Sequence, residues 1–304
     1  MSKIAFVFPG QGSQYVGMGK ELYENNESAK KAFDLIFGSL DFDLKEIMFN
    51  GTEEELKKTK NTQPAIVALS LVLEKLVREK GIEPDYVAGH SVGEYAAIAS
   101  SGFLTLEESV ELTAYRGMIM HEISEKVDGG MAAVLGMESE KIKNILKEVS
   151  GIVEAVNFNE PNQTVIAGEK LAIQEACELL KENGAKRAII LSVSGPFHSS
   201  LMEPAGEKIK EKLKSFKFKE SLIPVIGNTS AKEIVNSQGL EEELYLQSFG
   251  VVRWVETIEK LKQLGVKKIY EIGPGKVLSG LIKKIDKEIE VKNIEKLEDF
   301  ENLL

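Results

Sequence analysis

The order of predicted elements between residues 129 and 195 constrains the fold more than any other feature of the chain. The pattern predicts, in turn, a strand, a helix, two strands, a helix and a strand: "GGMAAVLGM", "ESEKIKNILKEVS", "VEAVNFN", "QTVIAG", "EKLAIQEACELLKENG" and "KRAIILSV". This β-α-β-β-α-β order is that of a ferredoxin-like unit. We therefore predict a small subdomain over residues 128–195, inserted into a larger body.

Short apolar strands and helices alternate on either side of that insert. "KIAFVF" ends at the turn "PGQG", and "DYVAGHS" leads into the small-residue helix "VGEYAAIAS"; after the insert come the strands "PVIGN" and "KKIYEIG" and the helices "RWVETIEKLKQLG" and "GKVLSGLIKKI". Such alternation is typical of a parallel sheet covered by helices. We predict an α/β fold whose large domain combines residues 1–127 and 196–304.

Helix-end signals support two long helices before the insert. In "QPAIVALSLVLEKLVREKG", Pro64 suits the first helical turn and Gly81 the C-terminal stop. Thr105 and Glu108 have the spacing of a capping box at the start of the helix predicted over residues 105–126.

Charge and cysteine content exclude several classes of protein. The 48 acidic and 38 basic residues give a formal net charge of −10, which argues against a nucleic-acid-binding or anionic-membrane surface. The only cysteine, Cys177, lies in an apolar run, so we expect a core residue and no disulfide. No stretch approaches the ~20 apolar residues that span a bilayer, and we expect a cytoplasmic protein.

The segment "VAGHSVGEYAAIAS" at 87–100 contains a G-x-S-x-G match, centred on Ser91. The match alone is weak, because a glycine-rich turn with a serine at the helix start is common. A catalytic serine of this kind requires a tight turn between a strand and a helix, and residues 85–100 predict that context. The amide of Val92 would then lie at the helix N-terminus, where an oxyanion is stabilised.

A serine nucleophile ordinarily needs a base, and the chain has three histidines. His90 is adjacent to the serine on an extended segment, so its side chain should point away from Ser91. His121 lies at the end of a helix and is expected to be solvated. His198 follows a predicted strand and a Gly-Pro turn, where catalytic side chains gather in α/β folds, and is the best candidate. No acid is placed to orient it, so a Ser-His dyad held by a backbone carbonyl fits as well as a triad.

Arg116 lies on the apolar side of its predicted helix, among Leu112, Thr113, Ile119 and Met120. A buried guanidinium needs a partner, and no carboxylate stands three or four positions away. The partner is either a distant Glu or Asp, or a carboxylate of the ligand. The second alternative would make the substrate an acyl group that carries a free acid.

Nucleotide and metal sites are not indicated. The segments "FPGQGSQYVGMGK" and "EIGPGKVLSG" fail both the dinucleotide and the phosphate-loop spacings. The chain also has no H-E-x-x-H motif, cysteine pair or acidic cluster with ligand spacing. We expect no metal and no bound cofactor.

The motifs taken together resemble the malonyl-CoA:acyl carrier protein transacylases of fatty-acid synthesis. The resemblance covers essentially the whole chain in order and rests on "FPGQGSQ", "TQPA", "GHSVGEY", "YRG", "NFNEPNQTVIAG", "GPFHSSLM", the glutamine before "VVRW", and "EIGPGKVLSGL". It implies a hydrolase-like α/β body with a ferredoxin-like insert. It also implies ping-pong transfer of malonyl from malonyl-CoA, through a serine ester, to the phosphopantetheine thiol of acyl carrier protein.

The resemblance implies a role for each matching residue. Ser91 would attack the thioester with His198 as base, and Arg116 would bind the malonyl carboxylate. The backbone N–H groups of Gln11 and Val92 would donate to the oxyanion, and the backbone carbonyl of Gln247 would orient the imidazole. Asn159 and Gln63 match polar positions near the site. Phe197 matches a bulky residue that selects for malonyl.

One residue departs from the family pattern, and one surface, the docking site for the carrier protein, is not assigned. Val251 stands where many relatives have proline, which implies a small shift of that loop. The carrier protein is acidic and so is this chain, so the sequence does not show which surface binds the carrier protein. Lys186 and Arg187 form one candidate basic patch. We expect the carrier protein to bind transiently and the enzyme to be a monomer.

Three other functions fit parts of the sequence. A serine esterase or thioesterase would pass the acyl group to water, but for neutral acyl chains it has no use for a buried unpaired arginine. An acyltransferase of a polyketide-type pathway would use the same chemistry with another extender unit. A binding protein that retains the fold without turnover has no need of both Ser91 and His198.

Overall fold

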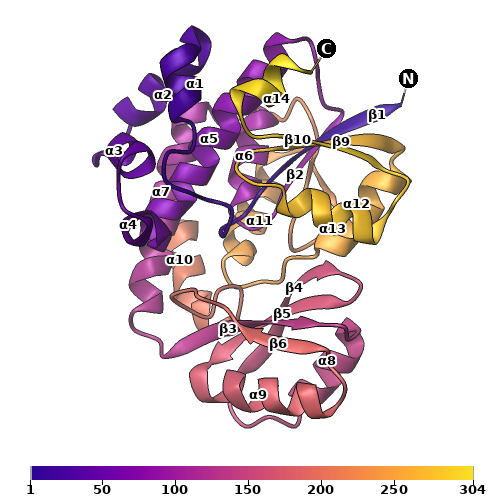
Figure 1. Cartoon of the computed structure of the whole chain (residues 1–304). Helices are drawn as coiled ribbons and strands as arrows, with labels where there is room; N and C mark the ends of the chain where they lie inside the picture. The colour runs from indigo at the N-terminus through magenta and orange to yellow at the C-terminus, as the bar shows by residue number, and fades with distance from the viewer. Residues whose placement is uncertain (1, 304) are drawn as a thin grey trace.

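The computed structural model describes residues 2–303, which form two sheets with their own helices (Figure 1). The larger sheet has the strand order β10-β9-β1-β2-β7-β8. All neighbours pair in parallel except β7 and β8, which are antiparallel. The strands are β1 (Lys3–Phe8), β2 (Tyr86–Gly89), β7 (Val225–Ile226), β8 (Glu233–Ile234), β9 (Val266–Ile272) and β10 (Glu290–Ile294). The predicted parallel α/β body is confirmed.

Helices cover both faces of this sheet. Phe6 and Phe8 of β1 pack into one core with α5, α6 and α7, whereas Ala5 and Val7 pack into a second core with α12 and α13. Figure 1 shows these two groups of helices on opposite sides of the strands. None of the helices within residues 2–303 is long and apolar enough to cross a membrane. The helices of the body are α1 (Lys20–Asn25), α2 (Glu27–Gly38), α3 (Leu44–Phe49), α4 (Glu53–Lys57), α5 (Thr59–Glu79), α6 (Gly93–Ser100), α7 (Leu106–Ser124), α10 (Glu203–Leu213), α11 (Ser237–Gln247), α12 (Trp254–Gln263), α13 (Val277–Ile285) and α14 (Leu297–Glu301), with the short 3₁₀ helix η1 (Ser200–Met202) before α10.

The structure shows where the two helices with predicted end signals, α5 and α7, begin and end. The Thr105 hydroxyl accepts from the Glu108 amide, and the Glu108 carboxylate accepts from the Thr105 amide, which confirms the capping box. The placement of Pro64 in a first turn is wrong, because α5 begins five residues earlier, at Thr59, and Pro64 lies inside the helix. Gly81 has φ = +77° just beyond the end of α5, a conformation that favours glycine.

The inserted segment forms a separate antiparallel sheet with the order β4-β5-β3-β6. In chain order this is the strand arrangement of a ferredoxin-like unit, as predicted. Helices α8 (Ser139–Leu146) and α9 (Lys170–Glu182) share a core with the sheet, in which Cys177 is buried. The strands, which lie within the limits of 128–195 that we propose for the subdomain, are β3 (Gly129–Leu135), β4 (Val153–Glu160), β5 (Gln163–Glu169) and β6 (Arg187–Ile190).

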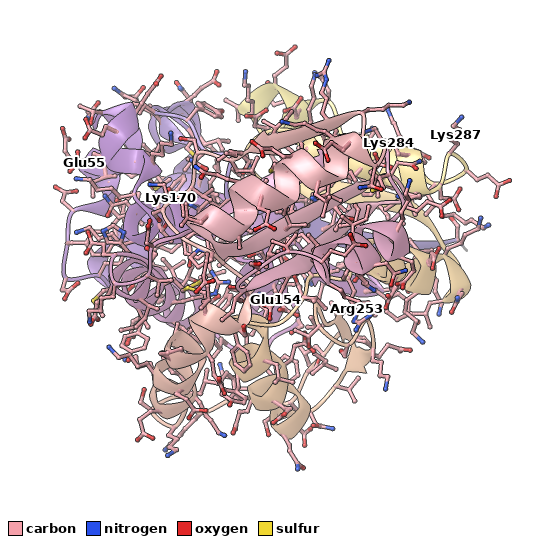
Figure 2. The ribbon with its side chains drawn as sticks, turned by 90° about the horizontal axis from the view of Figure 1, so that it is seen from below. Glu55, Glu154, Lys170, Arg253, Lys284 and Lys287 are labelled. Atoms are coloured by element: carbon pink, nitrogen blue, oxygen red, sulfur yellow. The ribbon has the colours of Figure 1, made fainter. Side chains whose placement is uncertain are left out.

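Strand β4 holds the subdomain to the larger body through the loop after α11. Val252 in that loop donates to the Val156 carbonyl at 2.8 Å and accepts from the Phe158 amide at 2.9 Å. The Glu154 carboxylate accepts from the Ser200 amide at 2.7 Å. Figure 2, seen from below, shows the subdomain in front of the larger body, with Glu154 labelled. The segments near residues 200 and 250 therefore lie between the two sheets.

Candidate active site

Ser91 occupies a tight turn between β2 and α6. Its φ of +51° lies in the left-handed region, which is costly for a residue with a side chain. A Cβ on Gly89 would lie 1.9 Å from the carbonyl carbon of Gly93, and a Cβ on Gly93 would lie 2.2 Å from the Phe8 carbonyl oxygen. Both glycines of the G-x-S-x-G match are therefore required by backbone packing, and the match is a true strand–turn–helix elbow.

Asn228, just beyond β7, holds this elbow in its strained shape. Its side-chain oxygen accepts from the Ser91 amide at 2.8 Å, and its Nδ2 donates to the Gly89 carbonyl at 2.7 Å. Its own amide donates to the buried carboxyl of Glu94 at 2.9 Å. Asn228 is not among the site residues predicted from the sequence, although it follows the predicted strand "PVIGN" at the carboxyl edge of the sheet, where functional side chains gather.

The structure brings Ser91 and His198 together from segments 107 residues apart. The Ser91 Oγ lies 2.7 Å from the His198 Nε2, within hydrogen-bond distance. His198 also has a left-handed backbone, with φ = +67°, so both members of the pair are held in unusual conformations. The imidazole Nδ1 lies 3.0 Å from the Gly250 carbonyl oxygen, which fixes Nδ1 as the protonated nitrogen and leaves Nε2 free to accept a proton.

The hydrogen bond to Gly250 refines one expectation. The resemblance implied that the Gln247 carbonyl orients the imidazole. Nδ1 lies 3.0 Å from the Gly250 carbonyl, and the Gln247 carbonyl makes a smaller contribution that also raises the pKa of His198. The reason is the loop after α11: Gln247 is the last helical residue, and the following turn carries the Gly250 carbonyl to the ring. Val251 lies in this loop.

The environment keeps His198 neutral. Burial, followed by the positive charge of nearby Arg116, lowers the pKa of His198 from 6.5 to about 3. The hydrogen bond to the Gly250 carbonyl opposes this shift but is the smaller effect. A neutral imidazole at physiological pH can accept the Ser91 proton, as a general base must.

This pKa predicts an unusual pH profile. The basic form exists above the pKa, so kcat/KM for acyl transfer should be flat from about pH 8 down to about pH 5 and fall only as the pH approaches about 3. Steady-state rates across that range, with circular dichroism as the control for acid unfolding, measure the profile. A bend near pH 6.5 would show that His198 titrates like an ordinary histidine.

Arg116 on α7 is completely buried and has no acidic partner within residues 2–303 at salt-bridge distance. Its Nη2 donates to Oε1 of Gln247 at 2.8 Å, while its Nε and Nη1 make no hydrogen bond to the described residues. Its guanidinium carbon lies 5.4 Å from the centre of the Tyr95 ring. A distant Glu or Asp was one of the two partners that the sequence allowed for Arg116, and residues 2–303 do not supply one.

The polar neighbours of Arg116 in the described chain form no ion pair with it. Burial, with a contribution from Glu243, raises the pKa of Glu94 well above 4.5, which favours its uncharged form. Burial likewise raises the pKa of Tyr95 to about 12. An uncompensated buried cation is costly, so the site is suited to a ligand that brings its own negative charge.

Two backbone amides near Ser91 make no hydrogen bond to the described residues. Among residues 2–303, the N–H groups of Val92 and Gln11 donate to no protein acceptor. Val92 caps the N-terminus of α6, next to the serine. A Cβ on Gly10 would lie 2.8 Å from the His90 carbonyl oxygen, so the loop that carries Gln11 lies against the elbow. The Gln11 side chain donates to the Thr59 hydroxyl at 3.2 Å.

His90 and Asn159 form a pair on the other side of the elbow. The His90 Nε2 lies 2.7 Å from Oδ1 of Asn159 on β4, and the ring packs edge-on against Trp254. Burial lowers the pKa of His90. His90 thus points away from Ser91, and Asn159 contacts the elbow through His90 and joins the two sheets.

The remaining residues make no side-chain hydrogen bond to Ser91 or His198 in the described chain. Gln63 on α5 is buried, and its Nε2 lies 3.6 Å from the Met120 sulfur, while its Oε1 has no partner in the described chain. Phe197, directly before His198, packs into an apolar cluster with Met120 and Met131. Arg187 lies exposed at the start of edge strand β6. Residues 2–303 contain no cluster of three His, Cys, Asp or Glu side chains placed for a metal ion.

Comparisons with known proteins agree with this geometry. Residues 5–295 match the model of the acyl transferase domain family. The chain is 47% identical over 292 residues to the malonyl CoA-acyl carrier protein transacylase of Bacillus subtilis, covering 95% of this chain and 92% of that protein. The crystal structure of the Streptococcus pneumoniae enzyme abbreviated MCAT matches with a TM-score of 0.94 and 42% identity, over 99% of each chain. A malonyl-transacylase in complex with a type II PKS acyl-carrier protein matches with a TM-score of 0.96 and 38% identity, over 100% of this chain and 99% of that one.

Proposed function

We propose, from the premise that this chain belongs to the acyl transferase family, that it moves malonyl groups from malonyl-CoA to acyl carrier protein. The proposal of malonyl as the acyl group rests on Arg116, a buried cation with unpaired N–H donors close to the serine–histidine pair. A malonyl carboxylate supplies the missing negative charge. A neutral acyl group leaves the guanidinium unpaired.

The first half of the reaction loads the serine. His198 takes the proton from Ser91 Oγ as that oxygen attacks the thioester carbonyl carbon. The amides of Val92 and Gln11 donate to the oxyanion that forms. The C–S bond then breaks, the proton passes from His198 to the CoA sulfur, and malonyl remains as an ester on Ser91.

The second half returns the group to a thiol. The pantetheine thiol of acyl carrier protein gives its proton to His198 and attacks the ester, and Ser91 recovers a proton as it leaves. The carrier protein supplies the phosphopantetheine, so the enzyme itself needs no bound cofactor. The named relatives, among them a transacylase solved with its carrier protein, support this acceptor. Fatty-acid synthesis is the pathway that we propose for the product, with the enzyme acting as a cytoplasmic monomer.

Phe197 is proposed to limit the size of the acyl group. Its ring belongs to the apolar cluster next to His198, where it would leave little room for an α-methyl substituent. The surrounding apolar side chains would also keep water from the acyl-serine. Gln63 and Asn159 are proposed as polar residues at the margin of the site.

A competition experiment tests the substrate and the acceptor together. Equal concentrations of malonyl-, methylmalonyl- and acetyl-CoA are mixed with holo acyl carrier protein and the enzyme, with Ser91→Ala as the blank. We expect malonyl-carrier protein to form first and in the largest amount. Equal formation of acetyl-carrier protein would contradict the malonyl assignment. Release of free malonate faster than transfer would favour the thioesterase alternative.

A further inference from the structure

The side chain of Gln247 joins the two halves of the site. It is fully buried; its Nε2 donates to the Ser91 carbonyl at 2.6 Å, and its Oε1 accepts from Nη2 of Arg116 at 2.8 Å. These partners fix the direction of the amide. If it were turned over, its NH₂ would face the guanidinium and its oxygen would face a carbonyl oxygen. The residue therefore contacts both the backbone of the nucleophile and the cation of the proposed carboxylate site.

Gln247 holds the arginine without neutralising it. A guanidinium has five N–H donors, and this bond uses one of them, so that a carboxylate can bind two of the others. The other groups around Arg116 are the Tyr95 ring and the buried carboxyl of Glu94, whose raised pKa favours the neutral acid. Among the described residues, Gln247 makes the hydrogen bond to the guanidinium at 2.8 Å, and the Tyr95 hydroxyl lies close by.

We propose, on the basis of the function proposed above, that Gln247 is a positioning residue that determines selectivity for acids. Its neutral amide holds Arg116 in place and leaves the positive charge to the substrate carboxylate. Its other end holds the carbonyl of Ser91, so that the nucleophile and the carboxylate site keep a fixed separation. The acyl group spans this separation when its ester carbon is on Ser91 and its carboxylate is on Arg116.

The Gln247→Glu substitution is the sharpest test, because it keeps the shape of the side chain and changes its charge. Its carboxylate would pair with Arg116 inside the protein and compete with the carboxylate of the substrate. It would also lose the N–H group that donates to Ser91, and this loss should affect every acyl donor alike. The ratio of malonyl to acetyl transfer therefore isolates the effect on Arg116.

The experiment measures kcat/KM for malonyl-CoA and acetyl-CoA, with holo acyl carrier protein as acceptor, in the wild type, Gln247→Glu and Gln247→Met. We expect Gln247→Glu to lower the malonyl-to-acetyl ratio by about tenfold or more, as expected when a buried charge pair is opposed. Gln247→Met should lower both rates and reduce the ratio less, because Arg116 remains uncompensated. A ratio in Gln247→Glu equal to that of the wild type would overturn the proposal.

Labelling of Ser91 by a neutral fluorophosphonate gives a second readout that does not need the carboxylate site. Gln247→Met should be labelled more slowly than the wild type, because the Ser91 carbonyl has lost a donor. If Gln247→Glu does not fold, Gln247→Met decides: wild-type values of both the labelling rate and the ratio would refute the proposal. A wild-type enzyme with no malonyl preference would instead refute the proposed function, so the two failures are distinguishable.

Discussion

Arg116→Ala is expected to lower kcat/KM for malonyl transfer by about 30- to 5,000-fold, which corresponds to the ~2–5 kcal/mol lost when one partner of a buried charge pair is removed. The wild-type guanidinium is completely buried and its Nε and Nη1 are unpaired in the described chain, and we propose the substrate carboxylate as its partner. Acetyl transfer should fall much less, because an acetyl group has no carboxylate to bind. Parallel assays with malonyl-CoA and acetyl-CoA measure the two losses.

Arg116→Lys is the matched control for charge. Lysine keeps the positive charge but replaces the planar fork with a single ammonium group, so we expect an intermediate loss of malonyl transfer. Equal losses of malonyl and acetyl transfer in Arg116→Ala would contradict the account and make Arg116 a structural residue.

Ser91→Ala is expected to reduce transfer to acyl carrier protein by about 10³- to 10⁶-fold, the range seen when a serine nucleophile or its base is removed. His198→Ala should cause a loss of similar size, because the two side chains share one hydrogen bond and act as a unit. The double variant should be little worse than either single variant, and a transfer assay on all three proteins measures this. Losses that multiply in the double variant would indicate that the two residues act independently.

The sequence predicted the two-sheet architecture because its signals are local. The β-α-β-β-α-β order, the capping box at Thr105 and the glycines of the elbow each depend on residues close together in the chain. The strands β8 and β10 were missed: β8 has only two residues, and β10 ("EVKNI") has two charged positions in an edge strand. Short edge strands carry little of the periodicity on which the prediction depends.

The contacts that complete the site could not be predicted because they join distant segments. Asn228 lies 137 residues from the Ser91 amide that it binds, and the Gln247 amide lies 131 residues from Arg116. The orienting carbonyl was assigned to Gln247, whereas Gly250 makes the main hydrogen bond and Gln247 contributes less, since a shift of three residues in a loop leaves no mark in the sequence pattern. The residue types were visible in the sequence, whereas their pairing depends on how the loop after α11 packs on β4.

Intact-mass analysis after mixing the enzyme with malonyl-CoA, in the absence of carrier protein, tests the central claim most directly. The wild type should gain the mass of one malonyl group, and peptide mapping should place it on Ser91. Addition of holo acyl carrier protein should then remove it, with malonyl appearing on the pantetheine thiol. A wild-type protein that gains no malonyl group, and releases malonate no faster than Ser91→Ala, would contradict the account.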